Sequence, residues 1–424
     1  MIYYQQGSAE EVISKNTLKE AVFSSLEKLG EKRKVLVIPP DFTRFHSRAG
    51  EITEYIWEYY GKTLTDILPA TGTHFAMTAE EITGMFGKVP HSLFRVHHWR
   101  SDLVTLGKVP SEFVCEVSGK RVNYDWPAQV NKLLVEGNYD LIVSVGQVVP
   151  HEVIGMANYN KNIFVGTGGQ EGINKSHFLG AAYGMERIMG RVDTPVRKVL
   201  NYASDHFGKN LPVLYILTVI GKDTNDGELK LRGLYTGDDI ECFKKAAALS
   251  LKVNFSMLEK PLKKVVVYLD PSEYKSTWLG NKAIYRTRMA IADGGELIIL
   301  APGLKEFGED REIDRLIRKY GYAGTPQILE WVSKNEDLQQ NLSAAAHLIH
   351  GSSENRFSIT YCPGHLSRQE IESVNFRYAD LPQMMKKYNP AMLKEGMNVT
   401  GGEEIFYISN PALGLWACKE RFKE

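Results

Sequence analysis

Two histidines and one lysine in the middle of the chain have side chains that suit acid–base, metal-binding or covalent chemistry. His151 comes directly after a proline, Lys161 follows ten residues later, and His177 sixteen residues after that. These intervals exceed the spacing of two ligands on one helical face, so only tertiary folding can bring the three side chains together. The segment follows the apolar run Leu141–Val145, and α/β proteins usually place their chemistry in loops beyond the carboxyl ends of buried strands. We therefore take it as the candidate site, although a single loop histidine or lysine is more often a surface residue.

An acidic and a basic side chain follow an earlier strand-like run. Asp41 and Arg44 come shortly after the run Val35–Ile38. The carboxylate can hold a hydroxyl group of a cofactor, and the planar guanidinium matches the carboxylate of an anionic substrate. The alternative is a local ion pair that braces the turn, and these two residues alone leave both explanations open.

A turn of small residues follows the run Leu64–Leu68. Its members are Thr71, Gly72, Thr73 and His74. Small side chains let backbone N–H groups and hydroxyls approach an anion, and the N-terminus of the helix predicted after Thr78 would add a favourable dipole. The turn therefore predicts a phosphate contact, although many strand-to-helix turns are rich in glycine without binding a ligand.

Two adjacent histidines follow the run Leu93–Val96, which we also predict to be a strand. In extended structure the side chains of His97 and His98 point to opposite faces, so at most one of them can face the site. Titratable and anion-binding groups thus follow four strand-like runs. Parallel strands bring such ends to one edge of a sheet, and this convergence is much less expected by chance than any single match.

The pattern of apolar runs predicts an α/β fold. Short runs rich in Val, Ile and Leu alternate with longer helical patterns, and further runs occur at Leu214–Ile220, Val265–Leu269 and Leu297–Leu300. Unbroken apolar runs suit strands buried on both faces, as in a mainly parallel sheet. At 424 residues the chain exceeds what one hydrophobic core fills. We therefore expect two α/β domains, a cofactor-binding catalytic domain over residues 1–260 and a second domain over residues 261–424 that closes an active-site cleft.

The composition excludes several classes of partner. The chain has 51 basic and 51 acidic residues, so it lacks the positive charge expected of a protein that binds nucleic acid or an anionic membrane. Its four cysteines are far apart and form no zinc or disulfide pattern. It contains no apolar stretch suited to a signal peptide or a membrane span. We therefore expect a cytoplasmic protein that acts on a small molecule.

Taken together and in this order, these elements resemble the nickel-dependent lactate racemase family, and the match is spread over most of the chain. The motifs of that family, in chain order, are a D-x-T-R element, a G-T-H turn, a histidine, a P-H pair, a lysine and a distal N-x-x-H element. Here they correspond to Asp41–Arg44, Gly72–His74, His97, Pro150-His151, Lys161 and Asn174–His177. The intervals from His151 to Lys161 and from Lys161 to His177 are similar to those of the family.

The resemblance implies a nickel-pincer nucleotide, a pyridinium mononucleotide that holds nickel through sulfur donors. Lys161 would carry this cofactor covalently, and His177 would complete the coordination of the nickel, for which imidazole and sulfur are suitable donors. The residues that would contact the cofactor are Asp41, Thr71, Gly72, Thr73 and His74. Loading would require cofactor-synthesis proteins as partners.

The resemblance also implies roles at the substrate. His97 and His151 would be the acid–base pair, with His98 as the alternative to His97, and Arg44 and Lys282 would hold the substrate carboxylate. The reaction would invert C2 of a 2-hydroxy acid, either lactate or a longer sugar acid, by reversible hydride transfer to the cofactor. Two histidines with pKa values near neutrality suit the reversible exchange of the hydroxyl proton.

Two other functions remain open. His97, His151 and His177 could bind zinc around an activated water in a hydrolase, although no acidic base lies in the same segments and Lys161 would have no role. A two-domain protein with Arg44 and Lys282 could also capture carboxylates without catalysing a reaction.

Overall fold

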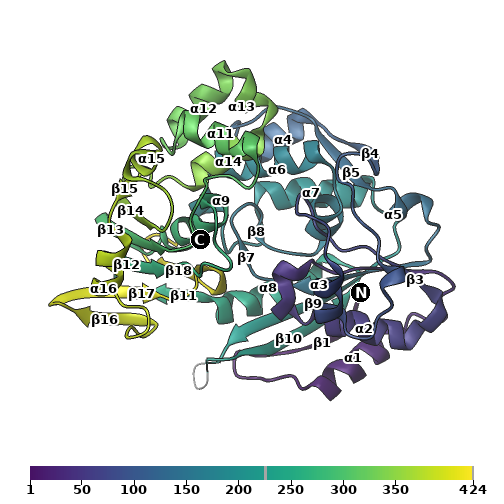
Figure 1. The fold of residues 1–424 in the computed structure, drawn as a ribbon. Coiled ribbons are helices and arrows are strands. Elements are labelled where there is room, and N and C mark those ends of the chain that lie inside the picture. The colour runs from purple at the N-terminus through teal and green to yellow at the C-terminus, as the bar shows by residue number, and fades with distance from the viewer. Residues whose placement is uncertain (224–226, 423–424) are drawn as a thin grey trace. The chain divides into compact units, whose positions relative to one another are not determined.

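The computed structural model describes residues 1–223 and 227–422, which form two compact units (Figure 1). The first unit comprises Met1–Leu179 and Ile188–Asn254, and the second comprises Gly180–Arg187 and Phe255–Glu424. Each unit is built on a mainly parallel sheet flanked by helices. The α/β class predicted from the apolar runs is therefore confirmed.

The central sheet of the first unit has the strand order β1-β10-β9-β6-β2-β3. Its strands are β1 (Ile2–Gly7), β2 (Val35–Ile38), β3 (Leu64–Ile67), β6 (Leu141–Gln147), β9 (Val213–Lys222) and β10 (Leu229–Gly237). The strands from β9 to β3 run parallel, whereas β10 and β1 pair antiparallel at the other edge. Every residue of β2 and β6 is buried, as expected of strands covered on both faces.

Helices and loops cover both faces of this sheet. The helices up to residue 254 are α1 (Lys15–Glu27), α2 (Ala49–Tyr60), α3 (Ala79–Phe86), α4 (Ser111–Val117), α5 (Leu133–Glu136), α6 (Gln170–Tyr183), α7 (Pro195–His206) and α8 (Ile240–Asn254). Apolar side chains of α1, α2 and α3 share one core with Val37 and Ile216 of the strands. Because side chains alternate along a strand, Tyr215 lies on the opposite face. There its ring contacts Tyr159, which stacks on Phe243 of α8.

The strand predicted at Leu93–Val96 is wrong. His91–Leu93 form a 3-10 helix, and an isolated bridge joins Phe94 to Ile67. Leu93 and Phe94 are half-buried, whereas Arg95 and the following valine are exposed. Only the first two residues of this run are covered by other parts of the protein, so the run cannot form a strand that is buried on both faces. His97 therefore follows a loop and not a strand.

Two small antiparallel pairs accompany the first sheet. They are β4 (Leu103–Val109) with β5 (Trp126–Asn131), and β7 (Pro150–His151) with β8 (Gly155–Met156). The helix start predicted at Thr78 is confirmed, since Thr78 and Glu81 form both hydrogen bonds of a capping box. This box orients α3 after the turn that contains Gly72.

The second unit has the strand order β15-β14-β13-β12-β17-β16, parallel except for the pair β16 and β17. Its strands are β11 (Phe255–Leu258), β12 (Leu262–Tyr268), β13 (Ile291–Ala301), β14 (Ser358–Pro363), β15 (Arg377–Tyr378), β16 (Gly396–Thr400), β17 (Glu403–Ile408) and β18 (Leu415–Cys418). Its helices are α9 (Thr277–Gly280), α10 (Lys282–Thr287), α11 (Arg311–Tyr320), α12 (Thr325–Lys334), α13 (Glu336–Gln340), α14 (Leu342–His350), α15 (Arg368–Ser373) and α16 (Leu381–Lys387). Across the described part of the chain, no helix combines the length and the apolar character needed to cross a bilayer.

Candidate active site at the carboxyl edge of the first sheet

Asp41 connects the segments that follow β2 and β3. It caps the 3-10 helix Phe42–Ser47, where its Oδ1 accepts the Thr43 N–H at 3.1 Å, and its Oδ2 lies 2.6 Å from Nδ1 of His74. Burial raises the pKa of Asp41, but the hydrogen bonds from His74 and Thr43 and the charge of Arg44 outweigh it, so the net pKa is lowered. The carboxylate therefore stays ionised and orients the His74 ring with its Nε2 directed away from Asp41.

The turn at Gly72 uses most of its backbone donors within the chain. Gly72, with φ +55°, donates its N–H to the carbonyl of Gly166 at 2.8 Å, and Thr71 and His74 donate theirs to Pro69 and Thr71. Thr71 is buried, whereas Thr73 and His74 are exposed. The turn therefore offers a cofactor the Thr73 side chain more readily than a set of free N–H groups, and the predicted cofactor contacts stay a prediction.

His151 lies in the hairpin formed by β7 and β8 after the carboxyl end of β6. Its side chain is 12% exposed, and its Nδ1 lies 3.7 Å from a carboxylate oxygen of Glu152. The N–H of Val153 donates to the same Nδ1 at 3.1 Å, so the neutral ring carries its proton on Nε2. Gly155 at the other side of the hairpin has φ +90°, and a Cβ there would lie 2.0 Å from the carbonyl oxygen of Arg191.

Burial is the main reason that His151 is neutral. It lowers the pKa of His151 well below the usual value; Glu152 opposes this lowering, whereas the positive charges of Lys161 and Arg44 and the proximity of His177 add to it. These side chains come from four separate segments, and Arg44, Lys161 and His177 lie within electrostatic range of His151. His151 is uncharged at neutral pH.

Lys161 lies over the carboxyl ends of β2 and β6. It precedes the short π-helix Asn162–Gly166, and the Asn162 side chain donates towards the carbonyls of Ile38 and Val145, each at 3.4 Å. Burial, and next the charge of Arg44, lower the pKa of Lys161 to about 8. Among the described residues, no hydrogen bond or ion pair engages its amine. About one tenth of this amine is therefore unprotonated and nucleophilic at pH 7.

A buried arginine that the sequence analysis did not identify holds the loop before Lys161. Arg197 on α7 is 1% exposed and donates to the carbonyls of Met156 at 2.6 Å and Asn158 at 3.3 Å, and to the side chain of Asn160. Asn158 adopts a left-handed backbone conformation with φ 68°. The guanidinium thus fixes a strained loop from the inside.

His177 on α6 has the ring orientation of a metal-binding histidine. Its Nδ1 donates to the carbonyl of Ile173 at 2.7 Å, so Nε2 carries the lone pair. Burial lowers the pKa of His177, and the charge of Lys161 lowers it further. The ring is therefore neutral at neutral pH, as a ligand must be.

His97 is hydrogen-bonded through both ring nitrogens. It is 4% exposed, its Nε2 donates to the carbonyl of Gly168 at 3.0 Å, and its Nδ1 accepts from the side chain of Asn131 at 3.0 Å. An acid–base role for His97 requires one of these buried bonds to break. His98 is exposed, and His74 keeps its Nε2 without a partner among residues 1–223 and 227–422.

The two cations expected at the substrate carboxylate lie in different units. Arg44 is half-buried in the first unit, and within the described residues its guanidinium makes no hydrogen bond or ion pair. Lys282 is the first residue of α10 in the second unit, with its amine 5.8 Å from the ring centroid of Tyr274. Arg44 is thus available to an anion, and the role of Lys282 stays a prediction.

The zinc site considered above is not formed. In the part of the chain that the structure describes, no three His, Cys, Asp or Glu side chains are grouped so that they could hold a metal ion. His97, His151 and His177 therefore do not make a three-ligand site, and any metal bound near His177 would need donors from another group.

Comparisons with known proteins agree with this picture. Residues 3–187 match the family model described as the lactate racemase N-terminal domain. A crystal structure of a Thermotoga maritima protein is similar with a TM-score of 0.81 and 25% identity, covering 96% of this chain and 98% of that one. The lactate racemase apoprotein from Thermoanaerobacterium thermosaccharolyticum is similar in fold with a TM-score of 0.70 and 18% identity, covering 97% of this chain and 94% of that one. No curated protein sequence matches the chain.

Proposed function

Because residues 3–187 match the lactate racemase N-terminal domain, we propose that this protein is a racemase or epimerase that inverts C2 of a 2-hydroxy acid. Lactate and longer sugar acids are the candidate substrates. The observation that carries the proposal is that Arg44, Lys161 and His177 lie within electrostatic range of His151. Such a cluster combines an anion-binding cation, a neutral imidazole and a nucleophilic amine.

The same residues fit a nickel-pincer nucleotide attached to Lys161. The unpaired amine of Lys161, with its pKa lowered to about 8, is suited to a covalent bond. Nε2 of His177 is the donor that a nickel ion would need. When bound, this nucleotide supplies an acceptor that reversibly takes the C2 hydride of a 2-hydroxy acid.

The chain itself must orient the substrate and move the hydroxyl proton. Arg44 binds the substrate carboxylate through its planar guanidinium. For His151 to act as a base, its single proton must lie on Nδ1, which is 3.7 Å from Glu152, so the hydrogen bond from the Val153 N–H to Nδ1 must open. Nε2 then takes the hydroxyl proton of the substrate, and the imidazolium that forms returns this proton to the keto oxygen in the reverse direction. Glu152 thus compensates the positive charge of the imidazolium.

We assign the second acid–base role to His74 in place of His97. Asp41 holds Nδ1 of His74 at 2.6 Å, which leaves Nε2 as the atom that exchanges a proton. His97 instead bonds Gly168 and Asn131, and these bonds position the loop before α6. Two histidines on different segments can serve the two enantiomers in turn.

The proposal is tested on protein produced together with proteins that synthesise the nickel-pincer nucleotide. Intact mass is expected to show an adduct on Lys161 that is lost in Lys161→Arg and kept in the control Lys198→Arg, which changes an exposed lysine. The adducted protein should invert 2-hydroxy acids and retain deuterium placed at C2. Inversion by protein with an unmodified Lys161, or an adduct without inversion of any 2-hydroxy acid, would contradict it.

No observation favours the two alternatives. A zinc hydrolase needs the three-histidine site that is not formed, and a simple carboxylate-binding protein gives no reason for a nucleophilic lysine. The variant His151→Ala distinguishes the racemase from the carboxylate-binding protein. It should abolish turnover of a loaded racemase, whereas a binding protein would keep its affinity and have no turnover to lose.

A further inference from the structure

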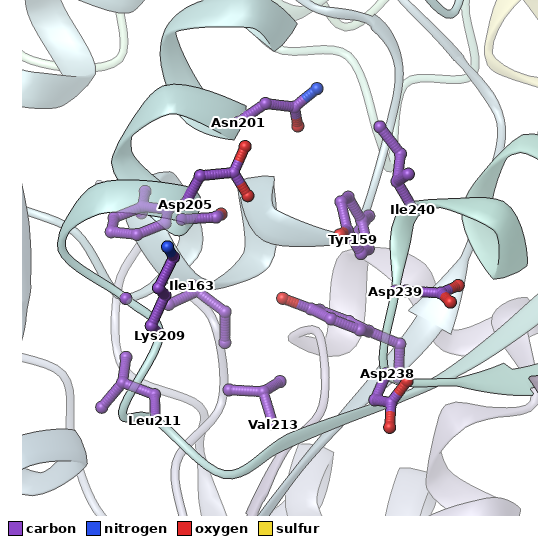
Figure 2. Close-up of a pocket in the computed structure, with 14 residues that line it drawn as sticks. Tyr159, Ile163, Asn201, Asp205, Lys209, Leu211, Val213, Asp238, Asp239 and Ile240 are labelled. Atoms are coloured by element: carbon purple, nitrogen blue, oxygen red, sulfur yellow. The ribbon is translucent and has the colours of Figure 1, made fainter. Parts of the chain in front are cut away.

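The first unit contains a cavity that none of the proposed catalytic residues lines. Its volume is about 340 Å³, within the range of small-molecule sites. It is lined by the segment around Tyr159 and Ile163, by the end of α7 and the loop that follows, by the start of β9 and by residues 238–240 (Figure 2). Lys161 lies between two lining residues in sequence but does not line the cavity itself.

Two buried tyrosines line this cavity with hydroxyl groups that have no hydrogen-bond partner. Tyr159 is 8% exposed and Tyr215 is 6% exposed, and both line the cavity. Within the described residues, neither hydroxyl makes a hydrogen bond. Neither hydroxyl oxygen is fully enclosed by protein atoms, so both open into the cavity. These two phenols therefore offer hydrogen bonds to a polar occupant.

One carboxylate of the cavity lining is unpaired. Asp205, Asp238 and Asp239 line the cavity together with one lysine, Lys209, and the amine of Met1 contacts Asp238 and Asp239. The charge of the buried Arg197 acts on Tyr159 and Tyr215. The Asp205 carboxylate has no ion pair or hydrogen bond among the residues that the structure describes, and it lies across the cavity from Asp239 in Figure 2. This unpaired carboxylate favours a cation over an anion beside Asp205.

One wall of the cavity is held in place before any ligand arrives. Asn160 is fully buried and its amide donates to Asn201 at 2.8 Å and to Ser204 at 3.1 Å. Arg197 in turn donates to Asn160. The residues of this wall therefore do not need to reorganise when a ligand binds, which favours affinity.

Apolar side chains supply the rest of the lining. Ile163, Leu211 and Val213 line the cavity between the polar groups. An occupant that satisfies the whole lining needs a hydrocarbon part for these residues and a positively charged donor for Asp205. The same positively charged group can also donate a hydrogen bond to the oxygen of a tyrosine hydroxyl.

We propose that this cavity is a binding site for a small organic cation, an alkyl chain with a terminal ammonium group. The ammonium donates to Asp205 and to the hydroxyls of Tyr159 and Tyr215, and the methylene groups pack on the apolar lining. The site is separate from the proposed acid–base residues, and its occupancy does not depend on the cofactor or on the reaction.

Isothermal titration of the full chain with three compounds of equal length tests this proposal. The probes are 1,5-diaminopentane, the neutral 1,5-pentanediol and the dianion glutarate. The diamine is expected to bind once per chain with a dissociation constant below about 1 mM, and to bind more tightly than the other two. Glutarate or the diol binding as tightly as the diamine would overturn the proposal, and so would a diamine affinity weaker than this.

Variants of the lining residues test whether the diamine binds in the cavity. Asp205→Asn and Tyr215→Phe should each weaken its affinity, Asp205→Asn by about tenfold because it removes a charge-assisted hydrogen bond. Asp193→Asn is the matched control, since it removes an exposed carboxylate outside the cavity. Circular dichroism checks that each variant is folded. Binding that is unchanged in both cavity variants, or weakened equally by the control, would overturn the assignment.

Discussion

Replacing Lys161 with methionine should stabilise the protein that lacks cofactor, and the gain should depend on pH. Burial and the charge of Arg44 lower the pKa of Lys161 from 10.5 to about 8. At about 1.4 kcal/mol for each tenfold change in proton affinity, this lowering corresponds to at most about 3 kcal/mol of unfavourable free energy in the folded state. The side chain is half-buried, so solvent screening reduces the measured value below this limit.

The sign of the pH dependence follows from the proton balance. Between pH 8 and 10.5 the unfolded chain holds the Lys161 proton and the folded chain has released it, so the free energy of unfolding of the wild type rises with pH. The penalty is full below pH 8 and disappears above 10.5. Lys161→Met removes it, so the variant should be more stable than the wild type by up to about 3 kcal/mol below pH 8, and this difference should shrink as the pH rises through the window.

Urea unfolding followed by circular dichroism measures this difference. Wild type, Lys161→Met and the control Lys15→Met, which changes an exposed lysine at the start of α1, are compared between about pH 6.5 and 10.5. Methionine also adds apolar surface, but that contribution does not vary with pH. A difference between Lys161→Met and wild type that stays constant over the whole range would refute the reasoning, because it would mean that burial does not lower the pKa of Lys161.

Three further predictions test the roles assigned to the site. His97→Ala should lower the free energy of unfolding by about 2 to 4 kcal/mol, because two buried partners lose their hydrogen bonds. His74→Ala should change the free energy of unfolding little but lower kcat of the loaded enzyme by about 100-fold or more. Thermal denaturation and kinetics that give the reverse pattern would restore the catalytic role to His97. Arg44→Ala should raise KM for the 2-hydroxy acid by about tenfold or more. It should also raise the pKa of His151, which the Arg44 charge lowers. An NMR titration that gives the same pKa of His151 in the variant and in the wild type would contradict this. Arg197→Met should lower the free energy of unfolding by about 2 to 4 kcal/mol in urea, because buried carbonyls lose their donor, and full stability would show that the loop before Lys161 does not depend on this arginine.

Local sequence patterns predicted the elements that are buried on both faces. The run Leu141–Val145 is a central strand because unbroken apolar side chains can be satisfied only between two covering layers. The helix after Thr78 begins where the sequence predicted, because Thr78 and Glu81, the two residues of the capping box, lie within one helical turn of each other. The prediction of a strand at Leu93–Val96 failed because three apolar residues interrupted by Arg95 carry no information about whether a second layer covers them.

The order of residues and apolar runs predicted that Asp41, Arg44 and His151 lie at one sheet edge, because parallel strands end on the same side, and the resemblance to a known family added Lys161 and His177. Only the tertiary structure decided which groups are free to react. From the sequence, His97 was predicted as an acid–base residue and His74 as a cofactor contact, but the first is enclosed by two hydrogen bonds and the second is held by Asp41 with one nitrogen left open.

The lowered pKa of Lys161 and the clamp made by Arg197 likewise arise from burial and from charges that lie far away in the chain. A linear sequence states which groups exist and in what order. Their proton affinity and reach depend on the water that folding removes and on the neighbours that it brings within a few ångströms.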